Sequence, residues 1–97
     1  MIQHSPELEK KLNDLRNKID DIDFKIRELL LERFQLVERI IQIKKELSSE
    51  LFDNKREIDI YNMIIKDLPS EVAASIKNIF EQIIIESRSF QKKRLGN

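Results

Sequence analysis

A single helical pattern of unusual length dominates this sequence. It starts at Ser5-Pro6, a favourable N-cap and first helical residue, and two apolar rows then recur every seven positions, as in a helix with one buried stripe. The first row is Leu8, Leu15, Ile22, Leu29, Leu36 and Ile43, and the second is Leu12, Ile19, Ile26, Ile40 and Leu47. A helix over about residues 6–47 would be ~60 Å long, whereas a compact domain of this size is ~26 Å across. We therefore expect a second copy of the chain to cover the stripe.

The composition excludes several classes of partner and of fold. The 97 residues include 18 Lys plus Arg and 18 Asp plus Glu, so the formal net charge is zero and neither nucleic acid nor a membrane is an expected partner. Cysteine is absent, and no apolar run is long enough for a transmembrane span or a signal peptide. One glycine and two prolines are typical of an all-α protein. We expect a cytoplasmic protein with one domain, residues 1–97.

Two further helices are predicted from start and stop signals. Asp53 is a favourable N-cap for a second helix over about residues 54–66. Pro69 interrupts the chain before a third helix over about residues 71–92. The expected apolar face of the second helix is Ile58, Tyr61, Ile64 and Ile65, and that of the third is Val72, Ile76, Ile79, Phe80, Ile83 and Ile84. The predicted fold is three helices per chain.

Two positive charges lie on the apolar stripe of the first helix. Arg33 occupies the one position missing from the second row, and Lys44 returns to within ~20° of the same direction. Val37, Ile40 and Ile41 lie between them on that line. Positive ends with an apolar middle suit a small dianion. Alternatively, Arg33 fixes the helix register, and Lys44 interacts with the dipole at the helix end.

Polar residues also interrupt the apolar stripe of the third helix. Ser87 and Gln91 are one helical turn apart and continue the line of Phe80 and Ile83. A buried hydroxyl or amide without a partner costs ~1–3 kcal/mol, so we expect each of the two to meet a partner or a ligand. The alternative is that the helix frays into water near its end.

A charged cluster, DNKRE at residues 53–57, opens the second helix. Capping and the helix dipole explain Asp53 and Glu57, but the charge of Arg56 opposes that end of a helix. Arg56 therefore needs a carboxylate partner, either from these two acids or from a ligand.

Arg16 lies ~25 Å along the first helix from Arg33, too far for both to hold one small ligand. An antiparallel second copy would bring its own Arg16 to that pocket.

Together these residues resemble the all-helical class of chorismate mutase. The resemblance covers almost the whole chain and rests on LRNKID (15–20), LLLERF (29–34), Lys44, DNKRE (53–57) and IFEQIIIESRSFQ (79–91). It implies an intertwined homodimer in which the long helices pair. It also implies the Claisen rearrangement of chorismate to prephenate, in the biosynthesis of phenylalanine and tyrosine, without a cofactor, a metal or a covalent intermediate.

The resemblance implies a site shared between two chains. One chain supplies Arg33, Lys44, Asp53, Arg56, Glu57, Ser87 and Gln91, and the partner chain supplies Arg16. Lys44 and Gln91 would donate hydrogen bonds to the ether oxygen of chorismate, where negative charge grows in the transition state. Arg56 would brace the neighbouring carboxylates and the substrate. Because an amide donates at any pH, we expect the activity to change little on moderate acidification.

The other implied roles concern the carboxylates and the hydroxyl of chorismate. Arg16 and Arg33 would bind the two carboxylates, since arginine forks hold them in a bidentate, oriented way. Ser87 would assist them. Glu57, with Asp53 nearby, would receive the ring hydroxyl.

Two other functions fit the same sequence. A branch of the family eliminates pyruvate from isochorismate in a similar cationic pocket, although Asp53 and the Arg56-Glu57 pair resemble the mutase branch. A non-catalytic helical dimer that serves as an interaction or regulatory module would use Arg33 and Lys44 only to fix the register of its helices. In either case, association or fusion with another enzyme of the shikimate pathway is compatible with the sequence.

Overall fold

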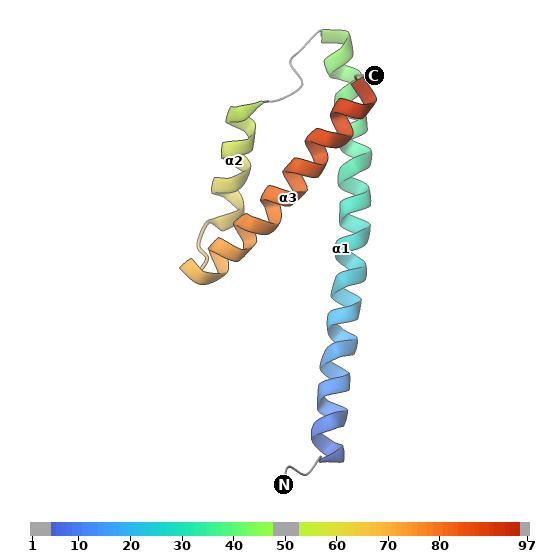
Figure 1. Ribbon diagram of the computed structural model, residues 1–97, viewed down its shortest axis with the longest axis vertical. Helices are drawn as coiled ribbons and strands as arrows, with labels where there is room; N and C mark the ends of the chain where they lie inside the picture. Colours follow the sequence, from blue (N-terminus) through green and yellow to red (C-terminus); the bar gives the residue numbers. More distant parts are fainter. Residues whose placement is uncertain (1–4, 48–52, 96–97) are drawn as a thin grey trace. The chain divides into compact units, whose positions relative to one another are not determined.

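The computed structural model describes residues 5–47 and 53–95, and all regular structure in these two ranges is α-helical. The helices are α1 (Pro6–Leu47), α2 (Asn54–Ile65) and α3 (Ser70–Leu95), shown in Figure 1. The predicted all-α fold with three helices is therefore confirmed. None of the described helices is long and apolar enough to cross a membrane.

Helix α1 begins where the sequence predicts. The backbone N–H of Leu8 donates to the Ser5 hydroxyl at 3.4 Å, and that of Glu9 donates to the Ser5 carbonyl at 3.0 Å. Glu7 and Glu9 in the first turn and Lys44 in the last turn all carry the charge that the helix dipole favours at their end. Local signals are therefore sufficient to fix where this helix begins.

Helix α2 is bounded by an N-cap and a tight turn. Asp53 is in an extended conformation (φ −124°), and its carboxylate accepts a hydrogen bond from the backbone N–H of Arg56 at 3.0 Å. After Lys66, Asp67 adopts a positive φ of 63°, a conformation that a short polar side chain tolerates. Helix α3 then follows Pro69, whose carbonyl accepts from Ala73 at 2.8 Å. As Figure 1 shows, α2 and α3 form a hairpin.

The chain divides into two compact units, residues 1–35 and residues 36–97. The second unit contains every buried residue of the described chain, and each helix contributes at least one. These residues are Val37 and Ile41 from α1, Ile60 from α2, and Ile84 and Ser87 from α3. A small apolar core therefore holds the end of α1 and the α2–α3 hairpin together.

The predicted apolar face of α2 needs one correction. Ile58 was expected to be inside, but its side chain is 58% exposed, and Ile60 is buried instead. Two residues along a helix correspond to about 200° of rotation, so Ile58 and Ile60 cannot both face the core. Tyr61, Ile64 and Ile65 are half-buried, in agreement with the prediction. In α3, Ile84 is the most buried member of the predicted face, and Val72 and Ile79 are exposed.

The described residues of the first unit, 5–35, form no core of their own. None of its described residues is buried, and its row residues from Leu8 to Leu29 are between 46% and 65% exposed. This is the surface that the heptad pattern predicts to be covered by a second copy.

Candidate functional site

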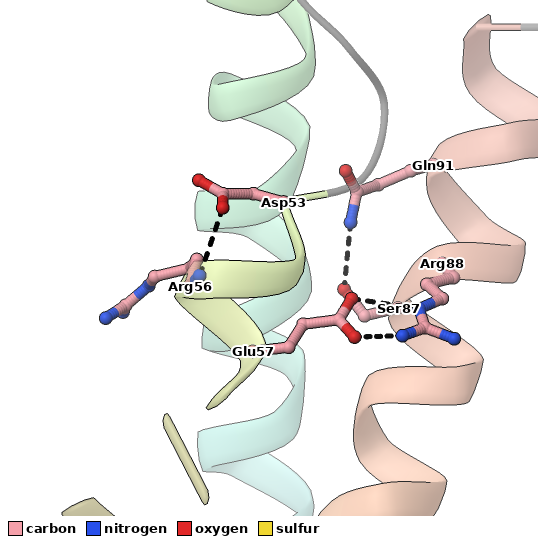
Figure 2. Close-up of polar contacts among 6 residues, drawn as sticks. All are labelled: Asp53, Arg56, Glu57, Ser87, Arg88 and Gln91. Atoms are coloured by element: carbon pink, nitrogen blue, oxygen red, sulfur yellow. Dashed lines mark hydrogen bonds and ion pairs between the residues drawn. The ribbon is translucent and has the colours of Figure 1, made fainter. Parts of the chain in front are cut away.

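A chain of three polar side chains links the end of α1 to α3. The Lys44 ammonium donates to Oε1 of Gln91 at 3.5 Å, a long hydrogen bond, and Nε2 of Gln91 donates to the Ser87 hydroxyl at 3.3 Å. Ser87 is buried, and both Lys44 and Gln91 are half-buried. Figure 2 shows the bond between Gln91 and Ser87. Lys44 and Gln91, which are 47 positions apart in the sequence, are thus in contact.

The orientation of the Gln91 amide follows from its neighbours. Lys44 is a donor only, so the atom that faces it must be the amide oxygen, and the amide nitrogen then faces Ser87. The amide nitrogen carries two N–H groups, and Ser87 accepts only one hydrogen bond from it. Gln91 therefore keeps a second N–H beyond its bond to Ser87, on an amide group whose oxygen contacts the Lys44 ammonium.

Ser87 has the partner that a buried hydroxyl requires. It is only 6% exposed and accepts from Gln91. Helix α3 continues to Leu95, beyond both residues, so fraying at the helix end does not explain their position. Within the described residues no buried side-chain nitrogen or oxygen lacks a hydrogen bond. Ser87 and Gln91, the two polar residues that interrupt the apolar stripe of α3, therefore belong to the packed unit.

Asp53 and Arg56 lie at the exposed start of α2. The Asp53 carboxylate caps the helix through the backbone of Arg56, whose guanidinium points away from the other labelled residues in Figure 2. No carboxylate among the described residues pairs with that guanidinium. Because Arg56 is exposed, water can hydrate it, and the expected carboxylate partner is not required within the chain.

Glu57 is held by a residue that the sequence reasoning missed. Arg88 of α3 donates from Nε to Oε2 of Glu57 at 2.9 Å and from Nη2 to Oε1, so both carboxylate oxygens are bound (Figure 2). The hydrogen bond to Glu57 raises the pKa of the Arg88 guanidinium. The signal in the sequence was weak, because Arg88 lies beside the stripe of α3 and its partner belongs to α2.

The predicted residues divide between the two units. Six of them, Lys44, Asp53, Arg56, Glu57, Ser87 and Gln91, belong to residues 36–97. Arg16 and Arg33 belong to residues 1–35, where Arg16 is exposed and Arg33 is half-buried, and their roles stay predictions. In the part of the chain that the structure describes, no group of three or more His, Cys, Asp or Glu side chains is placed to hold a metal ion.

The chemistry available in the second unit is that of hydrogen-bond donation to an anionic or polar guest. Lys44 offers an ammonium, Gln91 an amide, and Arg88 a guanidinium, while Glu57 offers a carboxylate that accepts. The arrangement is suited to electrostatic stabilisation by fixed donors.

Comparison with known proteins gives a consistent result. The family described as chorismate mutase type II matches residues 15–92. A chorismate mutase of Methanocaldococcus jannaschii is 36% identical over 89 residues, which cover 89% of each chain. A bifunctional chorismate mutase/prephenate dehydratase of Aquifex aeolicus is 33% identical over 90 residues, which cover 87% of this chain and 25% of that protein.

Proposed function

The chain belongs to the type II chorismate mutase family, and we propose that it catalyses the rearrangement of chorismate to prephenate. The observation that carries this proposal is the hydrogen bond from the Lys44 ammonium to the Gln91 amide oxygen, which brings the ammonium next to an amide group whose nitrogen is a second kind of N–H donor. An oxygen atom bound beside them would accept from both. Chorismate presents such an oxygen in the ether bond that breaks during the reaction.

These donors would act mainly in the transition state. As the carbon–oxygen bond breaks, negative charge grows on the ether oxygen, and hydrogen bonds from Lys44 and Gln91 strengthen with it. One such preorganised donor contributes roughly 10²-fold to 10³-fold in rate. A millionfold acceleration needs ~8 kcal/mol, which a few such bonds and the restriction of chorismate to a compact chair can supply. The rearrangement is intramolecular and requires no nucleophile, general acid or general base.

The substrate hydroxyl would bind at the start of α2. Glu57 is the carboxylate that lies between α2 and α3, and Asp53 is one turn before it. A hydroxyl donates readily to an ionised carboxylate, and such a hydrogen bond is stronger than one between neutral groups. The exposed guanidinium of Arg56 would steer the dianionic substrate toward this end of the site.

We propose that the working form is a homodimer in which the partner chain completes each site. The exposed row of residues 8–29 supports this proposal, because a continuous apolar stripe at heptad spacing is the pattern that a second helix covers. The two carboxylates of chorismate would bind Arg33 of one chain and Arg16 of its partner.

The cellular setting follows from the proposed reaction. We propose that the chain acts in the cytoplasm, where enzymes that consume prephenate would be close to it. The Aquifex relative combines chorismate mutase with prephenate dehydratase in one chain. We propose that this chain also functions near a second enzyme of that pathway, as a separate domain or through transient association.

The direct test is to incubate the purified protein with chorismate and to follow the loss of chorismate and the appearance of prephenate. A parallel incubation with isochorismate, followed by measurement of salicylate and pyruvate, distinguishes the lyase. We expect conversion of chorismate only. Turnover of isochorismate alone would replace the proposed reaction by the lyase reaction, and no turnover of either would favour a non-catalytic helical dimer.

A matched pair of lysine variants tests the site itself. Lys44→Met removes the ammonium that contacts Gln91, and Lys45→Met removes the neighbouring exposed ammonium of the same helix. We expect Lys44→Met to lower kcat by about 10²-fold to 10³-fold and Lys45→Met to change it less than about twofold. Equal effects of the two variants would show that Lys44 has no specific role.

A further inference from the structure

Arg88 binds both carboxylate oxygens of one acid. Its guanidinium binds both oxygens of Glu57 through Nε and Nη2, in the fork arrangement that arginine forms with carboxylates. The pair joins α3 to α2 across the hairpin. The Glu57 side chain is 14% exposed and that of Arg88 is 41% exposed, so the carboxylate is enclosed and the guanidinium reaches solvent. None of the substrate contacts proposed for this site involves Arg88.

The geometry leaves Glu57 able to accept a further hydrogen bond. An ionised carboxylate has about four acceptor positions on its two oxygens. Arg88 occupies one position on each oxygen. The remaining positions can receive a hydroxyl, and the carboxylate that receives it is already held in one orientation. Without Arg88, a glutamate side chain would have to lose its rotamer freedom when the substrate binds.

Charge gives Arg88 a second effect on the same carboxylate. A glutamate close to a dianionic substrate repels it, and this repulsion is stronger in a partly enclosed site than in water. The guanidinium of Arg88 stays positively charged at any ordinary pH and lies against Glu57, so it offsets this repulsion.

We propose that Arg88 is a positioning residue of the chorismate site, which holds the Glu57 carboxylate ready for the substrate hydroxyl and offsets its charge. This inference rests on the proposed function, because it requires chorismate to bind beside Glu57. Arg88 acts through Glu57 and does not touch the substrate. It also explains why a half-buried arginine of α3 is paired through two donors with one acid of α2.

The test is a double-mutant cycle on the full chain, with kcat and KM for chorismate measured for the wild type, Arg88→Met, Glu57→Gln and the double variant. If Arg88 acts through Glu57, we expect Arg88→Met to raise KM about tenfold in the wild type, the effect of losing one charge-assisted hydrogen bond. In the Glu57→Gln protein the same substitution should change KM less than about twofold.

Two further variants separate positioning from general stabilisation of the fold. Arg88→Lys keeps the charge and one donor but loses the fork, so its KM should lie between those of the wild type and Arg88→Met. Arg94→Met removes another α3 arginine, which pairs with Glu38 at 3.0 Å, and should leave KM unchanged. Thermal unfolding of all variants provides the measure of stability.

Each outcome of the cycle decides between distinct explanations. If Arg88→Met raises KM equally with and without Glu57, Arg88 binds the substrate directly, and the positioning role is wrong. If Arg88→Met lowers Tm without changing kcat or KM, the pair is structural, and the proposal is also wrong. A wild-type protein that does not convert chorismate would overturn the proposed function and this inference together, whereas an active wild type without coupling would overturn the inference alone.

Discussion

The two halves of α1 share one heptad pattern but differ in their surroundings. Up to Gln35, no described residue is buried, although leucine and isoleucine fill both rows except at Arg33. In the second unit the row residues stay exposed, with Leu36 at 51% and Ile43 at 55%, but Val37 and Ile41, each one position beyond a row, are buried. A second apolar face of α1 is thus packed where α2 and α3 are present in the same unit, whereas the two rows are exposed throughout the described helix.

This difference shows what each region needs in order to be stable. Most of the stability of a helix in a protein comes from packing of its apolar face, and an isolated helix is only marginally stable. The region of residues 36–95 has partners within the chain for that purpose. None of the described residues 5–35 is buried, and in the proposed dimer a second copy would cover their apolar rows.

The largest effect is expected from a charge on the exposed row. Ile19→Asp would place a carboxylate in the proposed helix–helix interface of both copies. Burial of an isoleucine contributes ~1.5–3 kcal/mol, so the loss from two copies is ~3–6 kcal/mol even before the charge is counted. We expect a monomer by sedimentation velocity and complete loss of chorismate mutase activity.

The control for this variant places the same side chain off the two apolar rows. Asn17→Asp lies on the same part of α1, and both positions are exposed in the single chain. We expect Asn17→Asp to remain dimeric and active. If Ile19→Asp were also dimeric and active, a second copy would not cover this row, and the contrast between the two regions would have another cause.

The next effect in size is the return of activity when two inactive variants are mixed. Arg16→Ala damages the first region, and Lys44→Met damages the second. After joint unfolding and refolding, half of the dimers should be mixed, and each of these has one intact site. We expect about a quarter of the wild-type activity to return, because each site takes Arg16 from the opposite chain.

The control mixture combines Lys44→Met with Gln91→Ala. These two residues contact each other within one chain, so each site of a mixed dimer keeps one defect. We expect no return of activity. If the first mixture also stays inactive although mixed dimers form, Arg16 does not serve the site of the partner chain.

Sequence signals were sufficient for features that depend on neighbouring residues. The Ser5 and Asp53 caps and the break at Pro69 lie where local preferences place them. The contact of Ser87 with Gln91 also follows from a spacing of one helical turn. In each case the interacting groups are at most a few residues apart, so their geometry is fixed as soon as the helix forms.

Features that join different helices were harder to predict. The sequence does not show which side of α2 faces α3, and Ile60 is buried where Ile58 was expected. The Arg88–Glu57 pair was missed for the same reason, since its members lie 31 positions apart on two helices. The contact of Lys44 with Gln91 was anticipated only through the resemblance to a family. Tertiary packing, not propensity, decides these contacts.

A smaller effect, confined to the second region, is expected when Gln91 becomes an acid. Gln91→Glu replaces a permanent donor by a carboxylate that donates only when protonated, and an ordinary glutamate has a pKa of about 4.3. Near neutral pH, kcat should fall about 10²-fold, and it should rise again as the pH is lowered toward that value. The wild type should vary little between about pH 5.5 and about pH 8.

Rate profiles against pH for the two proteins check this prediction, and dimer formation should be the same for both. The sign is fixed by the chemistry, because protonation restores the donor. A Gln91→Glu enzyme that gains activity with rising pH, or a wild type that loses activity along a group near pH 5, would contradict the role of Gln91 as a neutral donor.

The smallest effect concerns Asp53, for which capping alone is a sufficient explanation at the sequence level. Asp53→Ala removes the hydrogen bond to the Arg56 backbone and should lower the free energy of unfolding by about 1 kcal/mol. Asp53→Asn keeps a good cap, so its free energy of unfolding should be within a few tenths of a kcal/mol of the wild type.

If Asp53 also assists the substrate hydroxyl, Asp53→Asn should raise KM about threefold through the loss of charge assistance. An unchanged KM in this stable variant would reduce Asp53 to a cap and leave Glu57, held by Arg88, as the sole carboxylate for the hydroxyl.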